Sequence, residues 1–477
     1  MRCEPNARDF VFLPATLRTE VRPIDPHRLG PLIGSERLEV FLQAAADIRS
    51  QLGDRRIVNV NSTATGGGVA EMLATLLGYT LGVGIEAEWL VIEGGPAFFE
   101  VTKRIHNGLY GSPGDGGDLG PRERAIYERT ATANIARICA EVRPGDVAIV
   151  HDPQPAGLIG PLIEHGARVV WRCHVGYDGV NEWTERAWAF VRPYVESAHG
   201  HVFSRELFAP PWMDRARMRA IPPSIDPFTP KNVELGPAEV VGLLGAAGLL
   251  AVDHEPTDPR VTRRAEVIRE GRSPEPSVPL VVQVSRWDRM KDMVGVLDGF
   301  VVHVDGPAHL VLAGPVVTGV SDDPEGEEVW DETRTAWSRL PTEARSRVHL
   351  AAIPMADPVE NALVVNALQR HASVVVQKSL AEGFGLTVAE AMWKSRPVVA
   401  SAVGGIVDQV VDGETGLLVQ DPHDLAAFGA AVERLLDDPA EAARLARNAR
   451  NHIAEHFLGD RHLLQYAELL TELLRAD

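Results

Sequence analysis

Short apolar runs alternate with longer amphipathic stretches along most of the chain, beginning near residue 57. Runs of this kind, bounded by Gly, Pro and polar residues, are typical of strands buried in a parallel sheet. Their alternation with helical stretches favours an α/β fold. The predicted strands are 57–61, 87–92, 147–151, 169–172 and 201–204, followed by 280–285, 310–313, 348–351, 374–377, 398–400 and 416–419.

The clearest helices fall between these strands, at 69–81, 122–141, 182–196 and 293–302, and the chain is helical throughout from Asp424 onward. Residues 221–230 hold four prolines, which exclude a helix or a central strand and predict an extended connector. We therefore expect two doubly wound, Rossmann-like domains, 1–225 and 226–455, that face each other across a cleft. The last helix, about 456–477, is a candidate to pack back on the first domain.

Composition narrows the class of protein. A chain of 477 residues exceeds one ordinary core, and a net charge of −19 disfavours nucleic acid and anionic membranes as partners. The three cysteines, Cys3, Cys139 and Cys173, follow no metal or disulfide spacing, which favours a reduced, cytoplasmic setting. We find no signal peptide and no apolar run of about 18 residues that predicts a membrane span.

The segment 382–390, EGFGLTVAE, is the most informative one. It links a predicted buried strand to a predicted helix through a glycine-containing turn, and such a turn presents free N–H groups at the positive end of a helix dipole. This arrangement suits a diphosphate. Glu382 and Glu390 stand on either side, and carboxylates bind hydroxyls, so the pattern indicates a sugar nucleotide. The donor-binding residues predicted here are Glu382, Gly383, Phe384, Gly385, Leu386 and Glu390.

Glu382 and Glu390 could instead be the acid and nucleophile of a glycosidase. On a continuous helix, eight positions at ~1.5 Å each separate their Cα atoms by ~12 Å. Retaining glycosidases need carboxyl groups ~5–5.5 Å apart and inverting ones ~6.5–9.5 Å, so the spacing favours two hydroxyl-binding roles. The plainer alternatives are a helix N-cap for Glu382 and an exposed helical residue for Glu390.

A cationic loop, 285–292, follows the predicted strand 280–285. Arg286 and Lys291 in this loop could neutralise the charge that develops on a departing diphosphate. Alone, the loop would be interpreted as a solvated turn with incidental charges. Its pairing with the segment 382–390 on a neighbouring strand favours the functional interpretation.

Two further strand ends carry candidate groups. Gly66, Gly67 and Gly68 open a helix and allow a close backbone approach to a ligand, although a flexible turn explains them equally well. His151 ends another strand, where it either reaches a ligand at the sheet edge or caps the strand. Asp152 and Gln154 add polar groups to the same tip.

These residues resemble the retaining, nucleotide-sugar-dependent glycosyltransferases of the GT-B fold. The motifs in the first half of the chain are more specific, because they look like those of the trehalose glycosyltransferring synthases and trehalose phosphorylases. The resemblance spans about residues 56–420. The stretches that carry it are 60–63, 66–72, 89–93, 98–107, 151–155, 171–174, 221–227, 231–235, 286–291, 382–390 and 403–419.

The resemblance implies transfer of glucose, with retention, from UDP- or ADP-glucose to glucose, giving trehalose. It implies catalytic roles for Arg286, Lys291, Glu382 and His151. Glu390 would bind the ribose, and Gly67 and Gly68 would approach the donor. The acceptor side would hold Glu100, Lys103, Asn107, Asp152 and Gln154. Relatives of this kind also imply a homodimer.

No metal site is predicted, because His174 has no partner at ligand spacing. No cofactor is required, and Mg²⁺ is compatible with a diphosphate but is not indicated by a site. No carboxylate stands where a double-displacement nucleophile is recognisable, so we expect front-face transfer. The alternatives are a trehalose phosphorylase, a transferase with another small acceptor such as a sugar phosphate or polyol, and a non-catalytic sensor or epimerase on the same scaffold.

Overall fold

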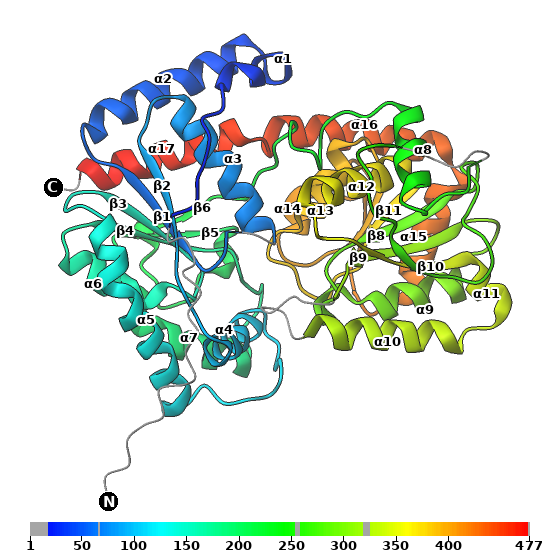
Figure 1. Cartoon of the computed structure of the whole chain (residues 1–477), viewed down its shortest axis with the longest axis horizontal. Coiled ribbons are helices and arrows are strands. Elements are labelled where there is room, and N and C mark those ends of the chain that lie inside the picture. Colours follow the sequence, from blue (N-terminus) through cyan, green and yellow to red (C-terminus); the bar gives the residue numbers. More distant parts are fainter. Residues whose placement is uncertain (1–17, 65–66, 253–257, 318–324, 476–477) are drawn as a thin grey trace, which may run out of the picture.

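The structure, a computed structural model, describes residues 18–64, 67–252, 258–317 and 325–475. Two parallel sheets form its two halves, each covered by helices on both faces (Figure 1). The predicted α/β class with two Rossmann-like, doubly wound halves is therefore confirmed. The domain limits at 225 and 455 stay a prediction.

The first sheet has six strands in the order β2-β1-β3-β4-β5-β6, all parallel. Its strands lie within one or two residues of those predicted, because their apolar side chains are buried on both faces. The structure adds a short edge strand, β6. The bounds are β1 Ile57–Asn61, β2 Ala87–Val91, β3 Val147–His151, β4 Arg168–Cys173, β5 Gly200–Phe203 and β6 Met218–Ala220.

The second sheet has seven strands in the order β13-β12-β11-β8-β9-β10-β7. All neighbours are parallel except β7, which pairs antiparallel with β10. The bounds are β7 Glu266–Ile268, β8 Leu280–Val284, β9 His309–Pro315, β10 Val348–Ile353, β11 Val374–Gln377, β12 Val398–Ser401 and β13 Leu417–Val419. Strand β7 is absent from the predicted strands, because an edge strand of three residues carries no buried run.

Helices cover both faces of each sheet. In the first half they are α1 Gly30–Ile33, α2 Ser35–Leu52, α3 Gly68–Gly82, α4 Pro96–Leu109, α5 Pro121–Glu141, α6 Ile159–Glu164 and α7 Glu182–Val195. In the second half they are α8 Pro237–Ala246, α9 Met293–His303, α10 Glu325–Arg339, α11 Thr342–Arg347, α12 Pro358–His371, α13 Leu386–Trp393, α14 Ile406–Gln409, α15 Leu425–Asp437 and α16 Pro439–His456. The last helix, α17 Gly459–Arg475, packs on the first half. The long helix α2 lies in a lead-in where no element was predicted.

The last helix crosses from the second half to the first. Figure 1 shows α16 over the second sheet and α17, in red, over the first, beside α2. Leu469, Leu470 and Leu473 of α17 share an apolar cluster with Ile48 of α2 and Val147 of β3. The connector runs alongside this crossing, and the Ile225 N–H donates to the carbonyl oxygen of Phe457 over 2.9 Å.

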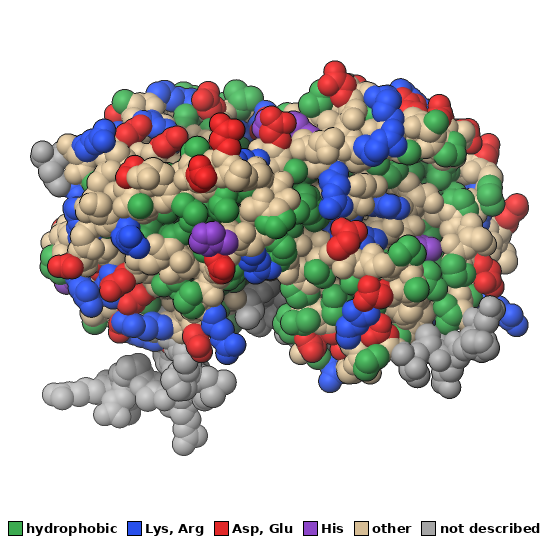
Figure 2. All heavy atoms as spheres, turned by 90° about the horizontal axis from the view of Figure 1, so that it is seen from above, with side chains coloured by type: hydrophobic (Ala, Val, Ile, Leu, Met, Phe, Trp, Pro, Cys, Tyr) green, Lys and Arg blue, Asp and Glu red, His purple; other side chains and the backbone are tan. Residues whose placement is uncertain are grey.

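The surface is mixed in charge. On the face shown in Figure 2, Lys and Arg side chains are interspersed with Asp and Glu side chains over both halves. Among the described residues, no helix is long and apolar enough to cross a bilayer.

Candidate active site at the facing edges of the two sheets

The cationic loop and the segment 382–390 meet at the carboxyl end of the second sheet. They follow β8 and β11, which are neighbouring strands. The Leu380 N–H donates to the carbonyl oxygen of Met290 over 2.8 Å, which ties the two loops together. Lys291 Nζ then reaches Glu382 Oε2 at 2.5 Å. The structure thus unites two of the predicted catalytic residues in one ion pair.

Helix α13 begins at Leu386, and its N-cap is Gly385, whose φ of 88° suits glycine. No side chain caps this end, so its first N–H groups stay available to an anion. Glu382 lies before the helix and is not its N-cap. The ~12 Å estimate for a continuous helix therefore does not describe the Glu382–Glu390 pair.

Glu390 is buried, which rules out the interpretation as an exposed helical residue. Its side chain is 6% exposed, and its Oε2 atom has no hydrogen-bond partner in the described part of the chain. Burial raises the pKa of the Glu390 carboxyl, and the nearby charges of Lys231 and Lys394 oppose that shift. An orphaned buried oxygen of this kind is a natural acceptor for a ligand hydroxyl.

Arg286 lies beside Asp288, with 3.5 Å between its Nη2 atom and Asp288 Oδ2. Although burial works against ionisation, the charges of Arg286, Lys103 and Lys291 lower the pKa of Asp288 to about 2. Asp288 therefore stays anionic and holds three cations near one another. A concentration of positive charge at a strand's carboxyl end suits a diphosphate.

In the first half, His151 lies at the end of β3 in a buried chain of polar groups. Its Nδ1 atom is 3.1 Å from His174 Nε2, and its Nε2 atom is 2.9 Å from Asn59 Oδ1. Arg172 Nε lies 3.5 Å from the other nitrogen of His174. Burial, helped by the charge of Arg172, lowers the pKa of His151 to about 3. Both imidazoles are thus neutral, and both ring nitrogens of His151 are already engaged.

Asp152 turns the chain sharply after β3. Its φ of 64° lies in the left-handed region, which non-glycine residues rarely adopt. Its Oδ1 atom accepts a 2.7 Å hydrogen bond from the His174 N–H, and burial raises its pKa to about 6. Nearby, Gln154 Oε1 is buried and has no partner among the described residues.

Three predicted acceptor residues lie on α4. Lys103 reaches across to the second half, with its Nζ atom 3.4 Å from Glu325 Oε2 and 3.9 Å from Asp288 Oδ2. Asn107, one turn further, lies against the loop at Gly114. Glu100 is exposed on the same helix. Positions three and four apart share a helix face, so the three residues lie on one side of α4.

The glycine turn before α3 touches the donor segment directly. A Cβ atom on Gly68 would clash with the Leu386 side chain, and Gly67 has a φ of 87°. Gly383 likewise leaves no room for a side chain, because its Cβ would lie 2.6 Å from the His174 carbonyl oxygen. The two halves are therefore in contact at these glycines. Gly66 lies outside the described residues.

Several residues at this boundary were missed from the sequence. Arg205 pairs with Asp178 at 2.5 Å and, in the second half, with Asp408 at 2.7 Å. Asp408, on α14, is not among the predicted site residues, although it joins the halves through this ion pair. Tyr110, at the end of α4, lies against Gly383. Contacts between distant loops leave no local pattern, so no signal was available.

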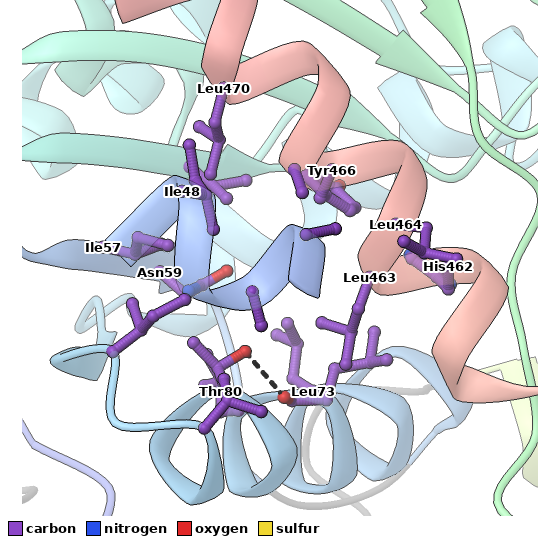
Figure 3. Close-up of a pocket in the computed structure, with 18 of the residues that line it drawn as sticks. Ile48, Ile57, Asn59, Leu73, Thr80, His462, Leu463, Leu464, Tyr466 and Leu470 are labelled. Carbon is purple, nitrogen blue, oxygen red and sulfur yellow. Dashed lines mark hydrogen bonds between the residues drawn. The ribbon is translucent and has the colours of Figure 1, made fainter. Parts of the chain in front are cut away.

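A cavity lies beneath α17, between α2, α3 and the first sheet, and Asn59 and His151 are among the residues that line it (Figure 3). Its lining is mainly apolar, with Ile48, Leu73 and Leu470 among the side chains. Of its few polar groups, the Thr80 hydroxyl already donates to the Leu76 carbonyl oxygen over 2.9 Å. A sugar needs many hydroxyl partners, so this cavity is not the sugar site.

Among the described residues, no group of three or more His, Cys, Asp and Glu side chains could hold a metal ion. The pair Trp171 and Trp188 packs in the core of the first half, with ring centroids 6.0 Å apart.

Comparison with known proteins shows which family the chain is similar to. Residues 59–210 match the model "Trehalose synthase, N-terminal domain", and residues 266–452 match "Glycosyl transferases group 1". A trehalose synthase of Pyrococcus horikoshii is 34% identical over 93% of this chain and 95% of its own. A trehalose phosphorylase of Pleurotus pulmonarius is 27% identical over 89% of this chain but only 57% of its own.

The fold has solved counterparts. The Escherichia coli structure titled "Trehalose-6-phosphate from E. coli bound with UDP-2-fluoro glucose" has a TM-score of 0.67 and 13% identity, and it covers 87% of this chain and 99% of that one. This likeness confirms the predicted GT-B fold. The relatives support the assignment of this chain as a hexosyltransferase that takes part in trehalose-related glycosyl transfer. The chain belongs to the trehalose synthase family of glycosyl transferases.

Proposed function

We propose that this protein transfers glucose from a nucleoside diphosphate glucose, UDP- or ADP-glucose, to glucose and so forms trehalose with retention. The observation that carries the proposal is the arrangement of Lys291, Glu382 and Glu390. Lys291, on the loop after β8, forms an ion pair with Glu382, which precedes α13, and Glu390 on α13 is a buried carboxylate with an unpartnered oxygen. They match the diphosphate, the hexose and the ribose of such a donor.

The Lys291–Glu382 pair marks where the sugar–phosphate bond would lie. Lys291 and Arg286 would bind the diphosphate, and Glu382 would bind hydroxyls of the glucose. Because Lys291 Nζ and Glu382 Oε2 are 2.5 Å apart, the proposed phosphate and sugar sites would adjoin. Residues 383–386 would bring the N–H groups of α13 to the diphosphate.

The chemistry would be front-face transfer. As the sugar–oxygen bond breaks, Arg286, Lys291 and the N-terminus of α13 would stabilise the charge on the leaving diphosphate. A diphosphate oxygen would take the acceptor's proton while the new bond forms on the same face. The chain's task would be positioning and electrostatics, with water excluded between the halves. We propose that no metal is required, since these groups supply positive charge.

The acceptor would lie against the first half, near Glu100, Lys103, Asn107, Asp152 and Gln154. The buried, unpartnered Gln154 Oε1 supports this assignment, because a sugar hydroxyl would satisfy it. His151 would contact the donor glucose through its backbone or ring edge, since its ring nitrogens are engaged. A homodimer and a cytoplasmic location complete the proposal.

The test is incubation with a panel of nucleoside diphosphate glucoses and glucose, followed by identification of the disaccharide. We expect α,α-trehalose with UDP- or ADP-glucose, with undiminished yield in a chelator. Turnover only with trehalose and inorganic phosphate would establish a phosphorylase instead. A different disaccharide with a sugar phosphate or polyol would correct the acceptor. Donor consumption without an acceptor would indicate an epimerase.

A further inference from the structure

Lys231 lies between two carboxylates contributed by opposite halves of the molecule. Its Nζ atom is 2.6 Å from Glu71 Oε2 and 3.9 Å from Glu390 Oε1. Glu71 belongs to the first turn of α3, which follows Gly67 and Gly68, whereas Glu390 belongs to α13. Figure 1 shows α3 at the boundary of the two halves, on the side of α13.

The two contacts of Lys231 differ in kind. At 2.6 Å, the ammonium group is hydrogen-bonded to Glu71, whose side chain is 53% exposed. At 3.9 Å, it lies beyond hydrogen-bond reach of Glu390, whose side chain is 6% exposed. Lys231 therefore compensates the charge of the buried carboxylate without occupying its lone pairs.

The other lysine near Glu390 does not bind its carboxylate. Lys394 Nζ donates to Asn232 Oδ1 over 3.0 Å, to Gln369 Oε1 over 2.8 Å and to the Glu390 carbonyl oxygen over 3.1 Å. These contacts use all three of its N–H groups. Burial also lowers the pKa of Lys394, which works against its positive charge.

The charged and titratable groups that face Glu390 are therefore Lys231, Lys394 and Glu71. Of these, Lys231 carries the fully developed positive charge beside the carboxylate. Glu390 Oε2 has no partner in the described part of the chain, so it awaits a donor from outside. An ionised acceptor makes a stronger hydrogen bond to a hydroxyl than a neutral one does.

We propose that Lys231 is a positioning residue for ribose recognition: it keeps Glu390 ionised with Oε2 free, and so makes the site select ribonucleotides over deoxyribonucleotides. This inference rests on the proposed function, since it needs a nucleotide donor. Its partner Glu71 links the same lysine to the glycine turn of the other half, and is not needed for selectivity.

The experiment measures the dissociation constants of uridine and adenosine diphosphate and of their 2′-deoxy and 3′-deoxy forms by calorimetry. For whichever base binds, we expect the wild type to prefer the ribose form by roughly 10- to 100-fold over at least one deoxy form. In Lys231→Met, that ratio should fall to about threefold or less. Lys231→Arg should keep most of it.

Glu71→Gln is the matched control. If Lys231 only bridged the halves through Glu71, Lys231→Met and Glu71→Gln would have equal effects, and the affinities for the ribose and deoxy forms would fall by the same factor. Our inference predicts that Glu71→Gln keeps the ribose preference. Lys231→Gln replaces Lys231→Met if the latter does not fold, as judged by its thermal transition.

The outcomes separate the two proposals. If the wild type binds no nucleoside diphosphate, the proposed function fails. If the wild type binds one but shows no ribose preference, or if Lys231→Met and Lys231→Gln keep the full preference, the role of Lys231 is overturned while the proposed function stands. If Glu71→Gln and Lys231→Met lost the ribose preference equally, the role of Lys231 would also be overturned.

Discussion

The two halves of the molecule bring polar groups to the boundary in different ways. The second half offers charges on adjoining loops, where Lys291 pairs with Glu382 and Asp288 is surrounded by cations. At the end of β3 the first half offers neutral groups, because His151 and His174 are buried, His151 lies within hydrogen-bond distance of His174 and Asn59, and the charged side chains of the first half at the boundary, such as Lys103, come from other elements. The difference suggests that the second half provides the electrostatics and the first half provides the shape of the site.

The sharpest way to break this contrast is Lys291→Ala. Loss of a cation beside the leaving diphosphate should lower kcat/KM by roughly 10²–10³-fold. Steady-state kinetics with the preferred donor would measure the effect. The control is Arg289→Ala, which removes a nearby exposed arginine that pairs with Glu328 and Glu332. This variant should change kcat/KM little. Unchanged turnover in Lys291→Ala would refute the diphosphate assignment.

Glu390→Gln should have the next largest effect. The amide can still accept a hydrogen bond at the buried position, but it lacks the charge, so donor affinity should fall roughly 10-fold or more. The loss should appear mainly in KM, because the ribose lies away from the reacting bond. A fall in kcat at unchanged KM would place Glu390 in the chemistry instead.

Acid should lower the free energy of unfolding, because buried neutral histidines of the first half resist protonation in the folded state. Burial lowers the pKa of His151 to about 3, and it lowers the pKa values of His174 and His462 well below 6.5. Their contribution to stability is complete above pH 6.5 and is lost as the pH falls toward 3. Each of these histidines should lower the free energy of unfolding by at most about 1.4 kcal/mol for each pH unit.

Asp152 opposes this trend, because its raised pKa of about 6 means that its contribution is lost as the pH rises through 6. Three histidines outweigh one carboxyl, so the net free energy of unfolding should fall between pH 6.5 and 4. Urea titrations at several pH values would measure it, and His174→Gln should flatten the curve. A wild-type stability that is level over this range would contradict the neutral assignment.

The smallest expected effect concerns the link between the halves. Arg205→Ala removes ion pairs to Asp178 and Asp408, so the KM for the donor should rise about two- to fivefold with little change in kcat. Arg217→Ala, which breaks an exposed pair with Asp214 within the first half, is the control. Equal behaviour of the two variants would mean that Arg205 does not connect the halves.

The fold was predictable because buried parallel strands leave continuous apolar runs, as at 147–151 and 374–377, where predicted and observed bounds coincide. Strand β7 was missed for the opposite reason, because it lies at the edge of its sheet and none of its three residues is buried. Helix α2 buries Phe41, Ala45, Ile48 and Leu52 at helical spacing, so its pattern is present in the sequence and was overlooked.

In the candidate site too, local motifs were predictable from the sequence and contacts between distant segments were not. Residues 286–291 and 382–390 are local motifs at strand ends, so the sequence alone predicted that the two segments follow neighbouring strands. Arg205, Tyr110 and Lys231 act across the boundary, and their partners lie far away in the chain. Such pairings depend on how the halves dock, which no spacing encodes.

The most direct test is a crystal structure of the protein with a nucleoside diphosphate glucose. We predict the diphosphate within hydrogen-bond distance of Arg286 and Lys291, the glucose on Glu382 and a ribose hydroxyl on Glu390 Oε2. A donor bound away from Lys291 and Glu390, with these side chains in the same ion pairs as before, would contradict this account.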